Sequence, residues 1–231
     1  MALTPSNDEA FLREVDDELR RDQMTTLWQR YGKLAIVGIA LFLVALAAFL
    51  WWRAEAVRKN EAQAEQLSVA LADVQGGRKA EAEQKFAALA AEGTSGYRAS
   101  ALLSKAALAE GRGDKKAALS ALASVAADEA LPQAYRDLAT IKQSMIDFDD
   151  VKPQVIVDRL KPLAVEGEPF FGTAGELTAI AYIKLNRGAE AGRLLAAIAK
   201  DPTAPETLRS RVIRLAAMLG TYVDPASLKK D

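Results

Sequence analysis

The chain has 231 residues, of which 30 are lysine or arginine and 31 are aspartate or glutamate, so its net charge near neutral pH is −1. It contains no cysteine and no histidine. These two absences exclude disulfides, thiol nucleophiles and Ser-His-Asp or Cys-His catalysis, and they remove the commonest zinc ligand. The balanced charge is not typical of proteins that bind nucleic acid. We therefore expect no cofactor, no metal site and no small-molecule substrate.

The first part of the chain, residues 1–33, is rich in acidic residues and precedes a long apolar run. Five apolar residues recur in it at near-helical spacing among charged ones and predict a short amphipathic helix: Phe11, Leu12, Val15, Leu19 and Leu27. Such a helix either lies on a membrane surface or in water, or docks on a partner on the cytoplasmic side.

The apolar run itself covers residues 34–52 and contains no charged residue. As a helix it is roughly 28 Å long, at about 1.5 Å per residue, which matches the hydrocarbon core of a bilayer. Amphipathic aromatic and basic residues flank both ends, as is typical of a membrane-spanning helix, and we assign them to the membrane interface: Trp28, Tyr31, Lys33, Trp51, Trp52 and Arg53. The sequence thus predicts one N-terminal transmembrane helix.

Two other interpretations of this run are open. A buried core helix is one, although a core helix of this length is rarely apolar on every face. A cleaved signal peptide is the other, since Ala45-Leu46-Ala47 has the small-x-small form of a cleavage site, but the long acidic stretch before the run is unlike a basic n-region. Basic residues near the run number four on the amino side and three on the carboxyl side, which favours a cytoplasmic N-terminus.

After Arg53 the chain is rich in Ala, Leu, Glu, Lys and Arg, and it lacks the alternating β-branched runs of strands. Gly and Pro interrupt it at regular distances. The apolar spacing between these breaks predicts helices, the first of them continuous with the membrane helix, near residues 53–74, 78–92, 97–110, 115–127, 132–148, 153–165, 171–185, 189–200 and 205–219.

An internal repeat organises these helices in pairs. Gly77, Gly113 and Asn186 are each followed by a small residue at offset five and by larger apolar residues at offsets nine and twelve. Near Val151 a degenerate copy keeps the offsets, with Ile156, Leu160 and Leu163, but lacks the turn residue. We assign repeat packing to Ala82, Phe86, Leu89, Ala118, Leu122, Val125, Ala179, Tyr182, Ala191, Leu195 and Ile198.

The series from Ala179 through Tyr182, Asn186 and Ala191 to Ile198 resembles a tetratricopeptide repeat. The predicted fold is therefore all-α, with one N-terminal transmembrane helix followed by a tetratricopeptide-repeat-like α-α superhelix of about four repeats over residues 53–222 and a C-terminal tail at 223–231. A generic helical bundle with accidental spacing is the alternative.

The layout of the whole chain resembles the ancillary SecYEG translocon subunit family of Gram-negative bacteria. The likeness rests on the segment from Phe11 to Arg20, the Trp28-Gln29-Arg30-Tyr31-Gly32 approach to the apolar run, and Gly76-Gly77 with Ala82 and Phe86. The resemblance implies a single-pass inner-membrane protein with a cytoplasmic N-terminus and a periplasmic repeat domain. It also implies association with translocon subunits and a membrane-anchored periplasmic chaperone, in support of newly translocated proteins.

Three classes of function remain to be compared. The first is a membrane-tethered interaction module, whose partner groove we expect at Tyr97, Tyr135 and Tyr182, although tyrosines also pack in cores with the hydroxyl at the surface. The second is a self-associating envelope scaffold, a homo-oligomer built through the same repeats. The third is an enzyme using Asp149-Asp150, but this pair precedes Lys152-Pro153 at a helix end, where a solvated turn is expected. We therefore expect a protein that is not an enzyme.

Overall fold

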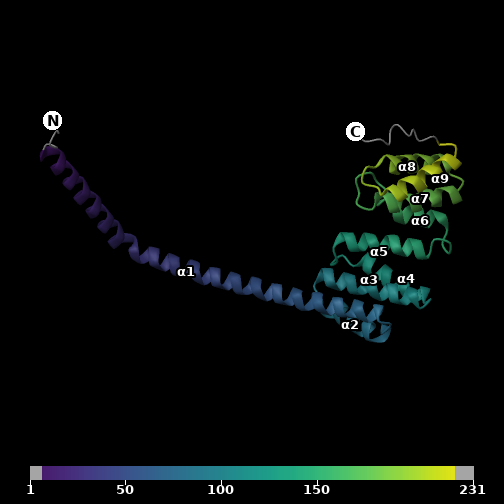
Figure 1. The fold of residues 1–231 in the computed structure, drawn as a ribbon, viewed down its shortest axis with the longest axis horizontal. Coiled ribbons are helices and arrows are strands. Elements are labelled where there is room, and N and C mark those ends of the chain that lie inside the picture. The colour runs from purple at the N-terminus through teal and green to yellow at the C-terminus, as the bar shows by residue number, and fades with distance from the viewer. Residues whose placement is uncertain (1–6, 222–231) are drawn as a thin grey trace. The chain divides into compact units, whose positions relative to one another are not determined.

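The computed structural model describes the backbone of residues 7–221 and the side chains of residues 32–221 apart from Ala35. Within these residues the fold is all-α, and Figure 1 shows helices α2 to α9 following one another in a stack. The helices are α1 (Asn7–Gln75), α2 (Lys79–Glu92), α3 (Ser95–Gly111), α4 (Lys115–Ala127), α5 (Gln133–Ile146), α6 (Pro153–Leu160), α7 (Phe171–Lys184), α8 (Gly188–Lys200) and α9 (Glu206–Met218).

The chain divides into two compact units, residues 1–60 and residues 61–231. In the first unit, α1 is long and apolar enough to cross a membrane, and none of its most apolar window is buried against protein. Leu43, Leu50 and Trp51 are all more than half exposed. A core helix would bury such side chains, so the exposure argues against the core interpretation of the run and supports the membrane one.

Helix α1 is longer than the sequence analysis expected at its amino end. The predicted short lead helix is not a separate element, because the helical backbone continues from Asn7 through the apolar run to Gln75. The stretch contains no proline after Pro5, and single glycines such as Gly32 and Gly38 cost only about 1 kcal/mol each in a helix. Nothing in the covalent chain therefore forces a break. The predicted continuity beyond Arg53 is confirmed.

In the second unit the helices form pairs, with a first helix (the end of α1, then α3, α5 and α7) and a second helix (α2, α4, α6 and α8); α9 follows the last pair. Buried side chains gather in four clusters, and each cluster draws on three consecutive helices. Helices α3, α5 and α7 each contribute to two clusters. Each pair thus packs only against its neighbours, which is the architecture of a helical repeat and confirms the predicted fold class.

The turn inside each pair explains the spacing of the repeat. Gly77 and Gly113 both have φ 77, and Asn186 has φ 59, so all three adopt the left-handed conformation that closes a helix at its carboxyl end. The amide nitrogens that follow them, in Arg78, Asp114 and Arg187, donate back to carbonyls of the helix just ended. Glycine and asparagine are the residues that tolerate this backbone.

Helix α6 is shorter than predicted, because it ends at Leu160 and not near residue 165. Pro162 provides the reason: its ring blocks the hydrogen bond and the space that a continued helix needs. This pair also lacks a left-handed residue at Val151. The degenerate copy is therefore a real helix pair with a longer turn, over residues 147–152.

Candidate functional site

A hollow of about 310 Å³ opens between helices α5, α7 and α9. Met145 of α5, Leu177 of α7 and Leu208 of α9 supply its apolar surface. The remaining lining comes from α7, α9 and the residue before α9: Thr173, Glu176, Pro205, Thr207 and Arg211. Three elements that are distant in sequence thus share one open surface.

Close approach of α9 to α7 forms the floor of this hollow. A Cβ atom on Gly172 would lie 2.6 Å from Leu208 Cδ2, and one on Gly175 would lie 2.8 Å from Ile198 Cδ1. An added Cβ at either position would therefore require the Leu208 or Ile198 side chain to shift, whereas glycine leaves both in place against α7. Leu208 is 7% exposed as a result, and it closes the base of the hollow.

The start of α9 is fixed by local chemistry. The Asp201 carboxylate accepts hydrogen bonds from the Thr203 amide at 2.8 Å and from the Thr203 hydroxyl at 2.7 Å. Pro205 then precedes the first turn, and its carbonyl accepts from the Leu208 amide at 2.9 Å. A proline just before a helix has no amide hydrogen to leave unpaired, so this sequence starts α9 at a defined place.

One ion pair joins α7 to α9 at the edge of the hollow. Arg211 donates from Nε to Glu176 Oε1, and from Nη2 to Glu176 Oε2 at 2.5 Å. The Glu176 side chain is 12% exposed, whereas that of Arg211 is 55% exposed. The carboxylate raises the pKa of the Arg211 guanidinium above its usual range, so this group stays cationic. It offers a fixed, half-exposed positive group beside an apolar surface.

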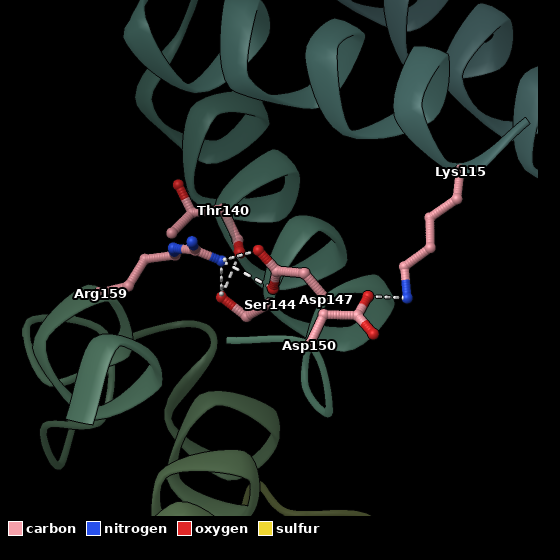
Figure 2. Close-up of polar contacts among 6 residues, drawn as sticks. All are labelled: Lys115, Thr140, Ser144, Asp147, Asp150 and Arg159. Atoms are coloured by element: carbon pink, nitrogen blue, oxygen red, sulfur yellow. Dashed lines mark hydrogen bonds and ion pairs between the residues drawn. The ribbon is translucent and has the colours of Figure 1, made fainter. Parts of the chain in front are cut away.

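A second polar cluster lies at the turn between α5 and α6, and Figure 2 shows its contacts. Arg159 Nη1 donates to both carboxylate oxygens of Asp147, at 2.9 and 3.0 Å, and to Ser144 Oγ at 3.3 Å. Ser144 Oγ in turn donates to the Thr140 carbonyl at 2.8 Å. These polar side chains hydrogen-bond to one another, so we interpret the cluster as a structural contact between α5 and α6.

The carboxylates considered for acid–base work lie in this turn but do not face one another in a pocket. Asp149 pairs with Lys184 of α7 at 2.5 Å, and Asp150 pairs with Lys115 of α4. Both side chains are more than half exposed. Among the residues that the structure describes, no three carboxylates lie close enough together to hold a metal ion.

The three tyrosines expected to line a partner groove lie in different places. Tyr97 packs against the cluster of α1, α2 and α3, and Tyr135 against that of α3, α4 and α5. Tyr182 packs between the last two clusters, with the Arg187 guanidinium 4.5 Å above its ring. The structure does not bring them together, and none of them lines the hollow.

Of the residues assigned to repeat packing, all but Ala118 belong to or pack against the core clusters. Tyr182 is partly buried, and the other ten are at most 1% exposed: Ala82, Phe86, Leu89, Ala118, Leu122, Val125, Ala179, Ala191, Leu195 and Ile198. The residues assigned to the membrane interface all lie on α1, where Lys33, Trp51, Trp52 and Arg53 are exposed. The side chains of Trp28 and Tyr31 lie outside the described residues.

Sequence reasoning missed the residues of the hollow. One signal was Met145, a large apolar residue directly after Ser144, the last buried position of α5, and the structure leaves 56% of it exposed. Gly172 and Gly175 were a second signal, since two glycines inside one helix imply close packing. Neither signal identifies α9 as the helix that approaches.

The structure is that of a helical-repeat protein. It consists of stacked helix pairs preceded by one helix that is long and apolar enough to cross a bilayer. More specifically, the chain belongs to the tetratricopeptide repeat-like domain family, whose model matches residues 26–207. Neither the curated proteins nor the solved structures contain a match to the chain. Domains of this family are generally protein-interaction modules and not enzymes.

Proposed function

We propose that this protein is a membrane-tethered interaction module that binds other proteins in the hollow between α5, α7 and α9. The observation that carries the proposal is the hollow lined by Met145, Leu177 and Leu208, in which the Met145 side chain is 56% exposed. A concave site with an apolar lining and a few polar groups is typical of binding sites. The family match supports the same class of function.

The proposal extends to the place of action. We infer that α1 holds the repeat domain on the periplasmic side of a bacterial inner membrane, where it associates with translocon subunits and a membrane-anchored chaperone and assists newly translocated proteins. The resemblance of the whole chain to the ancillary translocon family supports this, as does the small excess of basic residues before the apolar run. Tethering would raise the effective concentration of the module near its partners.

Site-specific crosslinking tests this function. The photoreactive residue p-benzoylphenylalanine is placed at Met145 and, as a matched control, at Val165, which is 51% exposed but does not line the hollow. Native membranes are irradiated, and the adducts are identified by mass spectrometry. We expect translocon subunits or a membrane-anchored chaperone to crosslink at Met145 and not at Val165.

Two other results would count against this account. Adducts of the chain with itself alone would favour the self-associating scaffold. Identical adducts from both positions would show that the hollow is not the place of contact.

A further inference from the structure

We propose that the hollow receives one bulky apolar side chain of a partner segment and that carboxylates next to this side chain pair with cations on the rim. This inference rests on the proposed function and specifies the chemistry of the partner. It commits to an acidic, amphipathic protein segment as the occupant.

The size and lining of the hollow fit a single large side chain. A cavity of about 150 Å³ lined by aliphatic and aromatic groups already accommodates a benzene ring. The hollow here is about 310 Å³, so it has room for an aromatic or leucine side chain and for part of the backbone that carries it. Met145 forms one wall, and its unbranched, polarizable thioether adapts to side chains of different shape.

Three cations form what we call the rim: Arg211 lines the hollow, and Arg214 and Lys142 each lie one helical turn from a lining residue, Arg211 or Met145. Arg211 and Arg214 are three residues apart on α9 and both are exposed, so they share one face of that helix. Lys142 lies one turn before Met145 on α5. The Glu176 carboxylate is already bonded to Arg211, and the neighbouring Glu206 is bonded to Arg209 and Ser210.

The net charge of these lysine, arginine and glutamate side chains is positive. Glu176 neutralises Arg211, whereas no described carboxylate lies within ion-pair distance of Arg214 or Lys142. A partner segment with carboxylates beside its apolar anchor would supply the missing negative charges. A basic segment would meet two uncompensated cations and would be disfavoured.

Peptide binding to the full-length protein in detergent micelles tests this proposal. The probes are two fluorescein-labelled peptides with the same Leu-Phe centre, one flanked by four glutamates and the other by four lysines. Fluorescence anisotropy measures both dissociation constants at low salt. We expect the glutamate peptide to bind about tenfold more tightly, with the preference falling as salt screens the charges.

Variants of the rim provide the decisive comparison. The double substitution Lys142→Glu with Arg214→Glu breaks no ion pair of the fold, and we expect it to abolish or reverse the preference. Thr173→Trp should block both peptides by filling the hollow, whereas the matched Val165→Trp should block neither. Circular dichroism checks that every variant keeps its helix content.

Three results would overturn the proposal: equal binding of both peptides, binding that survives Thr173→Trp, or no binding of either peptide. A chain that is dimeric and loses its dimer with Thr173→Trp would show that a second copy occupies the hollow. The proposed interaction function fails separately, when crosslinking in membranes recovers no partner protein at Met145.

Discussion

Asp73 and Asp147 occupy the same repeat position in the first and third helix pairs: each lies four residues before the turn position of its repeat, Gly77 or Val151, and its carboxylate pairs with a basic side chain twelve residues further on. Asp73 pairs with Lys85, and Asp147 pairs with Arg159. Both aspartates are at most 5% exposed. The equivalent positions of the second and fourth pairs are Ala109 and Tyr182, so the joint between the helices of a pair alternates between ionic and apolar chemistry.

The ion pair in the third helix pair predicts a non-additive mutational effect. Asp147→Asn leaves Arg159 without its partner at a site where Ser144 is fully buried, and we expect a loss of about 2–4 kcal/mol in the free energy of unfolding. Asp147→Leu combined with Arg159→Met replaces the pair by apolar groups and should recover much of this loss. Urea unfolding of the full-length protein in detergent, followed by circular dichroism, measures both. Equal destabilisation in the single and double variants would contradict the proposed role of the pair.

The first helix pair predicts a pH dependence. Hydrogen bonds from Lys85 and Arg78 lower the pKa of Asp73 below its ordinary value of 3.8. A carboxyl group with a lowered folded-state pKa contributes stability that is present above its unfolded pKa and is lost as the pH falls through the folded pKa. The melting temperature of the native protein should therefore exceed that of Asp73→Asn by a constant amount above about pH 5, and the difference should shrink below about pH 4. A difference in melting temperature that stays constant down to about pH 3 would contradict this account.

The left-handed turns predict opposite effects for two neighbouring glycines. Gly113 has φ 77, so Gly113→Ala forces a side chain into an unfavourable backbone and should cost about 1 kcal/mol. Gly111 ends α3 with nothing within 4 Å of an added Cβ, and Gly111→Ala should be neutral or slightly stabilising. Thermal unfolding of the two variants side by side checks this. A larger loss for Gly111→Ala would refute the turn assignment.

Core packing in the last helix pairs predicts a large loss on truncation. Leu195 is fully buried among residues of α7, α8 and α9, and Leu195→Ala should lower the free energy of unfolding by about 3 kcal/mol. Val165→Ala at an exposed site should change it by less than about 0.5 kcal/mol. Denaturant titration of both variants provides the measurement. Similar midpoints would mean that the fourth pair is not part of the cooperative core.

Much of the fold could be predicted because its signals are local. Helix spacing and the turn residues Gly77, Gly113 and Asn186 depend on neighbours within about a dozen positions, and the structure reproduces them. Pro162 is also visible in the sequence. Because proline disrupts a helix, it predicts an end of α6 before residue 162, as the structure shows. The lead residues are helical as expected, but the helix continues into the apolar run, since one glycine does not end a helix.

The candidate site could not be predicted in the same way. It depends on α9 approaching α7 at Gly172 and Leu208, which are 36 residues apart in the chain. No short-range pattern specifies which helix fills the space above a glycine. The tyrosines were candidates because they are amphipathic, but Tyr97 and Tyr135 each pack against one core cluster and Tyr182 packs against two.

The central claim is that α1 crosses a bilayer and holds the hollow on its outer side. Because the native chain has no cysteine, Met145→Cys introduces a unique thiol in the hollow, and Ser6→Cys introduces one in the lead segment. Spheroplasts expressing each variant are treated with a membrane-impermeant maleimide before and after permeabilisation. The account predicts that Met145→Cys is labelled in intact spheroplasts and Ser6→Cys only after permeabilisation; labelling of Met145→Cys only after permeabilisation would contradict it.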